Sequence, residues 1–325
     1  MKAVVITEQK ALEWRDVPDP TLDPGGVLID VYAAALNRAD LMQRAGNYPP
    51  PPGCPDWPGL EIAGVISDVS SEAAQRWHVG DKVCALLGGG GYAQRVSVDQ
   101  SMLMPIPAGL TMVEAAALPE AFATAYLNLF WEAGAKAGDT LLMHAGASGL
   151  ASVIIPMAKA FGLRVITSVL DAAKAASIAH LNADVVVDTS AESIVDVLKR
   201  ESAAGHPVNI AIDCLSGDKL GDCLPYVAHG CRWIIIASLA GEMTSVNMRT
   251  VYMKNIRIIG STLRSKSVEV KARILESLVM EVWPKVESGA VRPTIYKTLP
   301  IEEAETAHDI LMRGDNIGKV VLIVR

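Results

Sequence analysis

The stretch from Leu141 to Ser152 reads LLMHAGASGLAS and restricts the possible folds more than any other segment. It opens with a short apolar run that suits a buried parallel strand. Gly146 and Gly149 then supply a tight turn, and an apolar helical stretch begins at Leu150. Such a turn gathers free N–H groups and the helix dipole at one point, which suits a pyrophosphate. The glycines follow GxxG rather than the full GxGxxG fingerprint, so the turn alone is equally compatible with a plain βα connection.

The segments after this turn favour the coenzyme interpretation. From Pro119 to about Ser261, expected strands alternate with amphipathic segments such as Asp171–Leu181 and Glu192–Ser202. With Leu141–His144 the strands make six βα units, the number in a complete doubly wound parallel sheet. The further strands are expected at Arg164–Val169, Asp184–Asp188, Val208–Cys214, Cys231–Ser238 and Asn255–Ser261.

The first 118 residues have a different pattern, with short strands, many turns and one expected helix at Arg38–Ala45. This pattern predicts a small, partly closed β-barrel or sandwich. Its strands are expected at Ala3–Thr7, Val27–Ala35, Glu61–Val69, Lys82–Leu87 and Tyr92–Val98.

The last segment contains too few elements for a third domain. A helix over Lys266–Glu287 is followed by a strand at Ile295–Leu299, a helix at Ile301–Arg313 and a strand at Lys319–Val324. We expect these pieces to return and complete the barrel. The predicted class is therefore α/β, with a discontinuous catalytic domain (1–118 and 262–325) around a Rossmann cofactor domain (119–261).

Composition excludes several classes of function. The 325 residues are 50% hydrophobic and carry a formal net charge of −7, which argues against a nucleic-acid surface. No apolar run reaches membrane-spanning length, and the first residues lack the features of a signal peptide. The five cysteines form no CxxC pair, so we expect no structural zinc site and a protein of the reducing cytoplasm.

Seven motifs, taken together and in order, resemble those of one family. The chain is similar to the zinc-independent quinone oxidoreductases (zeta-crystallin-like) of the medium-chain dehydrogenase/reductase superfamily, most of all to their tumour-suppressor-inducible branch. The resemblance covers essentially the whole chain and implies a GroES-like catalytic domain beside the Rossmann domain. It rests on ALNRADLMQRAGNYPPPPG (35–53), GLEIAGVI (59–66), LLGGGGYAQ (86–94), ALPEAFATAY (117–126), HAGASG (144–149), STLRSK (261–266) and NIGKVVL (316–322).

The positions that bind zinc in metal-dependent relatives indicate the reaction class. By this resemblance Asn37 stands where those relatives have a cysteine, and Leu60 where they have a histidine. Leucine cannot coordinate a metal, and an amide oxygen is a poor zinc ligand. We therefore expect no metal and an acceptor that takes hydride without one, such as a quinone.

The resemblance assigns catalytic roles to Tyr48 and Asn37. Tyr48 could donate a hydrogen bond or a proton to the reduced oxygen, or it could simply pack on the proline run that follows it. Asn37 offers an amide donor at the vacated metal position, or it caps a turn. Asp40 is expected to brace the local helix.

The resemblance also implies a set of coenzyme-binding residues. Ser148 would bind phosphate or nicotinamide, although a serine there could equally cap the following helix. Arg264 could reach a phosphate or lie solvated at the surface. The full set is Thr124, Gly146, Ser148, Gly149, Leu150, Lys174, Ser238, Leu239, Leu263, Arg264, Ser265 and Asn316.

The residues at the end of the second Rossmann strand bear on the choice of coenzyme. NAD-preferring sites place an acid there, whereas this chain has Val169, and Lys174 matches a basic residue of NADPH-binding relatives. Leu170, Asp171 and Thr189 depart from that pattern, and the charge of Asp171 opposes a 2′-phosphate. The prediction is NADPH, with NADH as the alternative.

The sequence therefore predicts an NADPH-dependent quinone reductase acting on a small molecule. The resemblance implies a homodimer joined by edge pairing of the sixth strand near Ile256–Gly260. Two alternatives stay open. One is an enone or 2-alkenal reductase on the same scaffold, and the other is a non-catalytic nucleotide-binding or structural protein.

Overall fold

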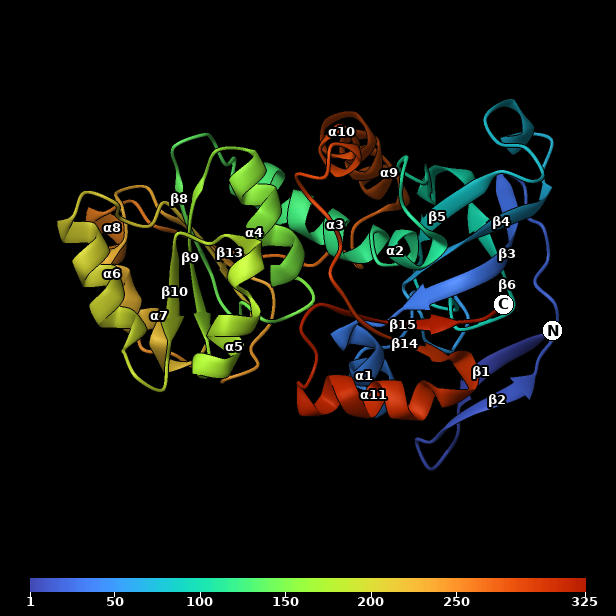
Figure 1. The fold of residues 1–325 in the computed structure, drawn as a ribbon, viewed down its shortest axis with the longest axis horizontal. Coiled ribbons are helices and arrows are strands. Elements are labelled where there is room, and N and C mark those ends of the chain that lie inside the picture. Colours follow the sequence, from blue (N-terminus) through green and yellow to red (C-terminus); the bar gives the residue numbers. More distant parts are fainter. The chain divides into compact units, whose positions relative to one another are not determined.

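The computed structural model describes residues 1–325, which form two compact units. Unit 1 consists of Met1–Ala123 and Leu263–Arg325, and unit 2 of Thr124–Thr262. Figure 1 traces the chain through both units from the blue N-terminus to the red C-terminus. The first boundary lies five residues beyond the predicted 118/119, because the first half of helix α3 (Pro119–Tyr126) belongs to unit 1.

Unit 2 contains one sheet of six parallel strands in the order β10-β9-β8-β11-β12-β13. The predicted doubly wound Rossmann sheet is confirmed. Because β9 and β11 flank β8 on opposite sides, the connections reverse direction beside β8, and such a reversal leaves a crevice at the carboxyl ends of the strands. The strands are β8 (Thr140–Met143), β9 (Arg164–Val169), β10 (Val185–Asp188), β11 (Ile210–Asp213), β12 (Arg232–Ile235) and β13 (Arg257–Gly260).

Several helices of unit 2 begin where the sequence offers a capping side chain. Asp171 accepts a hydrogen bond from the Lys174 amide at the start of α5, and Ser193 accepts one from Val195 at the start of α6. The core on one side of the sheet includes the fully buried Trp233. The helices are α4 (Ala151–Ala160), α5 (Ala172–Ser177), α6 (Ile194–Ala203), α7 (Asp218–Cys223) and α8 (Met248–Met253).

Unit 1 is built on a seven-stranded sheet with the order β14-β15-β3-β4-β5-β7, in which β6 also pairs with β3. The C-terminal strand β15 pairs antiparallel with β3, so the end of the chain extends the sheet that its beginning forms. The strands are β3 (Gly26–Ala35), β4 (Glu61–Val69), β5 (Lys82–Leu86), β6 (Arg95–Asp99), β7 (Leu103–Pro105), β14 (Ile295–Pro300) and β15 (Lys319–Ile323), with a separate hairpin of β1 (Lys2–Ile6) and β2 (Leu12–Asp16).

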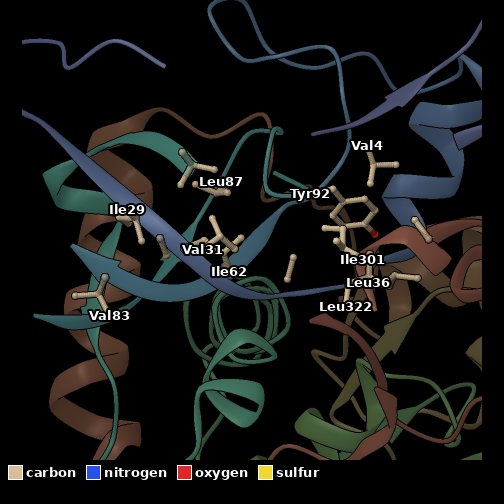
Figure 2. Packing of buried hydrophobic residues seen from close by; sticks show 14 of the residues in the cluster. Val4, Ile29, Val31, Leu36, Ile62, Val83, Leu87, Tyr92, Ile301 and Leu322 are labelled. Atoms are coloured by element: carbon tan, nitrogen blue, oxygen red, sulfur yellow. The ribbon is translucent and has the colours of Figure 1, made fainter. Parts of the chain in front are cut away.

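The core of unit 1 gathers the inward-facing residues of this sheet. Figure 2 shows the ring of Tyr92 among the aliphatic side chains of this cluster, with Val4, Leu36 and Ile301 nearby. The tyrosine is fully buried, so its hydroxyl needs a partner inside the unit. Helices α1 (Arg38–Ala45), α2 (Met112–Ala116), α9 (Val268–Ser277), α10 (Trp283–Glu287) and α11 (Ala304–Arg313) complete the unit.

Three expectations about unit 1 need correction. Strands β2 and β7 were not predicted, and the strand expected at Tyr92–Val98 begins only at Arg95. The single helix expected over Lys266–Glu287 is divided into α9, a π-helical turn at Leu278–Val282, and α10. Pro284, which has no amide hydrogen, stands at the start of α10, where that hydrogen is not needed. None of the helices combines the length and apolarity that crossing a bilayer requires.

Candidate functional site

The turn between β8 and α4 presents backbone N–H groups without partners. Gly146 donates to the Ser168 carbonyl at 2.8 Å and Ser148 to the Ala145 carbonyl at 2.9 Å. The amides of Ala147, Gly149 and Leu150 have no hydrogen-bond partner in the structure. They lie at the amino end of the ten-residue α4, where the dipole favours an anion. This arrangement fits a pyrophosphate.

Two residues of this turn have further constraints. A Cβ on Gly146 would lie 2.5 Å from Thr167 Oγ1, so the turn packs too closely on β9 for a side chain. The Ser148 hydroxyl oxygen accepts a hydrogen bond from the Ala151 amide at 3.1 Å. This bond gives Ser148 the helix-capping role, which is one of its two expected roles.

A cavity of about 450 Å³ lies beside this turn, at the carboxyl ends of the strands. It fits the crevice expected where the strand order reverses. Its lining includes His144 after β8, Ser168 in β9, Thr189 after β10 and Asp213 at the end of β11. A larger cavity, of about 860 Å³, opens at the amino ends of β8, β12 and β13, which is the wrong edge of the sheet for a dinucleotide.

The residues expected to select the coenzyme lie around the end of β9. Leu170 is exposed at 73%, and Asp171 caps α5 through a 2.8 Å bond from the Lys174 amide. Lys174 lies in the first turn of α5. The Thr189 hydroxyl donates to the Val169 carbonyl at 2.9 Å. Capping directs the Asp171 carboxylate to the Lys174 amide of its own helix, and the amino end of that helix offsets part of the negative charge.

In unit 1, a buried ion pair lies beside Asn37. The Lys319 ammonium contacts Glu61 Oε1 at 2.6 Å, and both side chains are almost fully buried, at 3% and 0% exposure. Asn37 joins them, since its Nδ2 donates to Glu61 Oε1 at 2.9 Å and its Oδ1 accepts from Lys319 Nζ at 2.7 Å. Both ends of the Asn37 amide are thus committed within unit 1, and the ammonium supplies the positive charge at this position.

Two more carboxyl groups belong to this buried cluster. Asp40 accepts hydrogen bonds from the amides of Asn37 and Gly59 and from the Tyr92 hydroxyl, at 2.8, 2.9 and 3.1 Å. Burial nevertheless raises the pKa of Asp40 to about 6. The Glu120 amide donates to Glu61 Oε2 at 2.8 Å, and desolvation and the charge of Glu61 raise the pKa of Glu120 to about 8.

Tyr48 is held by Arg264, whose guanidinium carbon lies 4.6 Å from the centre of the tyrosine ring. The same guanidinium donates to the carbonyls of Tyr48 and Gly88 and to Gln43 Oε1. Arg264 is only 7% exposed, so the alternative of a solvated surface arginine is wrong. These four hydrogen bonds leave one of its five N–H groups for a phosphate.

Comparisons with known proteins agree with this division of the chain. Residues 23–108 match the alcohol dehydrogenase GroES-like domain, and residues 149–278 match the zinc-binding dehydrogenase family. Quinone oxidoreductase of Mus musculus is 28% identical over 312 residues, covering 95% of this chain and 92% of that protein. The quinone oxidoreductase of Thermus thermophilus, whose structures include a complex with NADPH, is 29% identical with a TM-score of 0.83 and full coverage of both chains. The chain belongs to the medium-chain dehydrogenase/reductase superfamily.

Members of this superfamily differ in reaction. A solved NAD-dependent alcohol dehydrogenase is 27% identical to this chain, with a TM-score of 0.83 and full coverage of both chains. The quinone oxidoreductase-like protein 2 homolog of Nematostella vectensis is 29% identical over 300 residues, covering 91% of this chain and 81% of that protein. Membership of the superfamily therefore indicates an oxidoreductase that uses a nicotinamide dinucleotide, and by itself it does not fix which coenzyme or which substrate.

The remaining predicted coenzyme residues of this oxidoreductase fall in both units. In unit 2, Thr124 lies in α3, where its carbonyl accepts from Asn128 at 2.7 Å, and Ser238 and Leu239 are exposed after β12. In unit 1, Leu263 is buried, and Ser265 is exposed beside Arg264. The buried Asn316 donates to the Gly318 carbonyl at 2.7 Å.

Sequence reasoning missed three charged residues of unit 1, namely Glu61, Glu120 and Lys319. Each stands in or next to an apolar run, in GLEIAGVI, ALPEAFATAY and GKVVLIV. Charged residues are almost never fully buried unless they are paired. A single charge inside or beside an otherwise apolar run was therefore the available signal, in strands β4 and β15 for Glu61 and Lys319 and in helix α3 for Glu120.

Proposed function

We propose that this protein is an NADPH-dependent quinone reductase that transfers hydride without zinc. Two features carry the proposal. In unit 2 it is the turn between β8 and α4, residues 144–150, which we call the coenzyme turn. In unit 1 it is the buried Lys319–Glu61 pair beside Asn37. An ammonium fixed at that position leaves no need for a metal cation to balance Glu61. The similarity to quinone oxidoreductases of mouse and of Thermus thermophilus supports a quinone as the acceptor.

In this proposal the coenzyme supplies the hydride, and the chain orients the reactants and excludes water. The turn amides of Ala147, Gly149 and Leu150 would bind the pyrophosphate. Tyr48, steadied by Arg264, would donate a hydrogen bond to the acceptor oxygen. Burial and the charge of Glu120 raise the pKa of Tyr48, so its hydroxyl keeps its proton through the neutral range.

NADPH is the proposed coenzyme because β9 ends at Val169, without an acid to hold a ribose 2′-hydroxyl, and because Lys174 lies in the next turn. NADH is the alternative, favoured by the negative charge of Asp171. Replacing Asp171 with Ser keeps a helix cap and removes that charge. We expect the variant to bind NADPH more tightly relative to NADH, and an unchanged ratio would show that Asp171 does not influence the choice.

A turnover assay with matched acceptors tests the substrate class. Purified protein and NADPH are supplied with a small quinone or with a 2-alkenal, and coenzyme oxidation is followed by absorbance. We expect faster oxidation with the quinone. Faster oxidation with the alkenal would favour the enone reductase, and the absence of turnover and of coenzyme binding would favour a non-catalytic protein.

We further propose that the protein is a cytoplasmic homodimer that pairs through β13. This strand is the last in its sheet, and its Ile258 is 43% exposed. An apolar strand with a free edge is a hazard for aggregation unless another chain pairs with it. Sedimentation equilibrium should give twice the chain mass, and a monomer at micromolar concentration would refute the proposal.

A further inference from the structure

Glu120 differs from the other acids of unit 1 in how its two ends are held. Its backbone amide is fixed by the 2.8 Å hydrogen bond to Glu61 Oε2. Its carboxyl group accepts no hydrogen bond from the protein, and the residue is only partly buried. Glu61 and Asp40, in contrast, are fully buried and fully engaged. Glu120 is therefore the one acid of the cluster that can reach a bound molecule.

The charge balance of the cluster requires that protons be held on it. Asp40 of α1, Glu61 of β4 and Glu120 of α3 lie around the single ammonium of Lys319 from β15, which is bonded to Glu61. Lys271 of α9 also acts on Glu120 and lowers its pKa, but the lysine is itself partly buried and its own pKa is lowered by that burial. Three carboxylates facing one strongly bound cation are unfavourable at low dielectric.

These groups together raise the pKa of Glu120 to about 8, with desolvation as the largest cause and the charge of Glu61 next. The amino end of α3 favours the anion, but by less than the equivalent of one pKa unit. The balance leaves Glu120 protonated at neutral pH. Asp40, with a pKa of about 6, is enclosed by its three donors and cannot pass a proton outward.

Glu120 also affects the pKa of Tyr48, the side chain that is proposed to contact the acceptor. Its charge contributes to raising the pKa of Tyr48 above that of an ordinary tyrosine. A phenol of raised pKa is a poorer acid than a carboxyl group whose pKa lies close to the working pH. Of the Tyr48 hydroxyl and the Glu120 carboxyl group, Glu120 is therefore the one whose pKa suits proton transfer near neutral pH.

We propose that the Glu120 carboxyl group delivers the proton that completes reduction of the acceptor, while Tyr48 only orients it. The inference rests on the proposed quinone reductase function. The quinone gains two electrons and one proton as hydride and needs a second proton to become a neutral hydroquinone. The O–H bond of Glu120 breaks as the hydroquinone O–H bond forms, and the resulting carboxylate, near Lys271, recovers a proton from water.

The first test needs neither coenzyme nor acceptor. Carbon-13 NMR of protein labelled at the glutamate carboxyl carbons follows each group through a pH titration, and Glu120→Gln identifies the signal that disappears. We expect that signal to titrate near pH 8. Glu302→Gln, at an exposed position of the turn before α11, is the control and should leave the signal near pH 8 in place. A Glu120 signal that titrates near pH 4 would overturn the proposal.

The second test separates proton transfer from binding. Glu120→Gln keeps the shape of the side chain but cannot donate an acidic proton. We expect kcat with a quinone to fall about a hundredfold at pH 7 with little change in KM, and the decline of the wild-type rate above pH 8 to disappear. Glu120→Asp should keep that alkaline decline. Thermal melting of each variant confirms that it is folded.

The outcomes distinguish this inference from the function on which it rests. A wild-type protein that reduces quinones, with a Glu120→Gln variant of equal kcat and equal pH profile, would overturn the role of Glu120 alone. A wild-type protein that binds NADPH but reduces no quinone would overturn the proposed function, whatever the NMR titration shows.

Discussion

The two polar sites of this oxidoreductase are built from different groups. In unit 2, the coenzyme turn offers backbone amides at Ala147, Gly149 and Leu150, and it places no charged side chain there. In unit 1, the cluster around Asn37 depends on side-chain charges that are buried far from solvent, including Glu61 and Lys319. A site formed by backbone amides is sensitive to side chains that crowd it. A site formed by buried charges is sensitive to the loss of either sign of charge.

The largest effect is expected where that balance is broken. Lys319→Met would leave Glu61 buried without its cation, which should lower the free energy of unfolding by about 3–5 kcal/mol. Urea denaturation measures the loss. Lys199→Met, at an exposed position of α6, is the matched control and should be nearly neutral. If both variants were equally stable, the cluster would not depend on its single cation.

The turn between β8 and α4 should be most sensitive to an added side chain. In Gly146→Ala the new Cβ would lie 2.5 Å from Thr167 Oγ1 and 3.0 Å from Ile178 Cδ1, so the turn must move. We expect a loss of about 1–3 kcal/mol in stability and weaker NADPH binding. Gly260→Ala, where a Cβ would meet no atom within 4 Å, should bind NADPH normally. Equal coenzyme affinity in the two variants would remove the turn from the binding site.

Tyr48→Phe sharpens the division of roles in unit 1. Loss of a hydrogen bond to the acceptor should reduce kcat/KM with a quinone about tenfold, equivalent to about 1.4 kcal/mol. The alkaline decline of the rate should stay, because it belongs to Glu120. Tyr32→Phe, at a residue 40% exposed on β3, serves as the control. An unchanged rate in Tyr48→Phe would remove that hydroxyl from the site.

A smaller effect, on stability at acid pH, is expected at His308, a buried histidine of unit 1. Neither ring nitrogen has a hydrogen-bond partner, and the ring makes an edge-on contact with Tyr92 at 5.9 Å between centroids. Desolvation lowers the pKa of His308 to about 4, so the unfolded chain takes up its proton first. Stability contributed by the neutral ring is therefore complete above pH 6.5 and is lost as the pH falls toward 4.

His308→Leu removes this titration and keeps an apolar side chain of similar volume. At pH 5.5 the wild-type histidine should already cost about 1 kcal/mol relative to pH 8, and the variant should lack that loss. Urea denaturation at the two pH values measures the difference. An equal decline in both proteins would assign the acid sensitivity to other groups.

The same contrast explains what the sequence could predict. Periodicity placed β4, β9 and α1 at their observed bounds, because their patterns are local. Strand β2 was missed because its sequence LEWRD carries three charges and pairs only with β1. The π-helical turn at Leu278–Val282 interrupts a pattern that reads as one continuous helix.

The candidate sites divide in the same way. The turn between β8 and α4 could be predicted because its strand, glycines and helix are consecutive in the chain. The cluster of unit 1 could not, because Asp40, Glu61 and Lys319 meet only through the pairing of β15 with β3 and of β3 with β4. Arg264 shows the same limit, since its partners Gln43 and Gly88 lie far away in sequence.

We propose that this one protein binds NADPH and passes the hydride of the coenzyme to a quinone. Titration of the purified protein with NADPH and with NADH, followed by coenzyme fluorescence with and without a small quinone, tests it most directly. We expect tighter binding of NADPH than of NADH, and oxidation of the bound coenzyme only when quinone is added. Tight binding of NADH alone would contradict the choice of coenzyme, and binding of neither would contradict the enzyme itself.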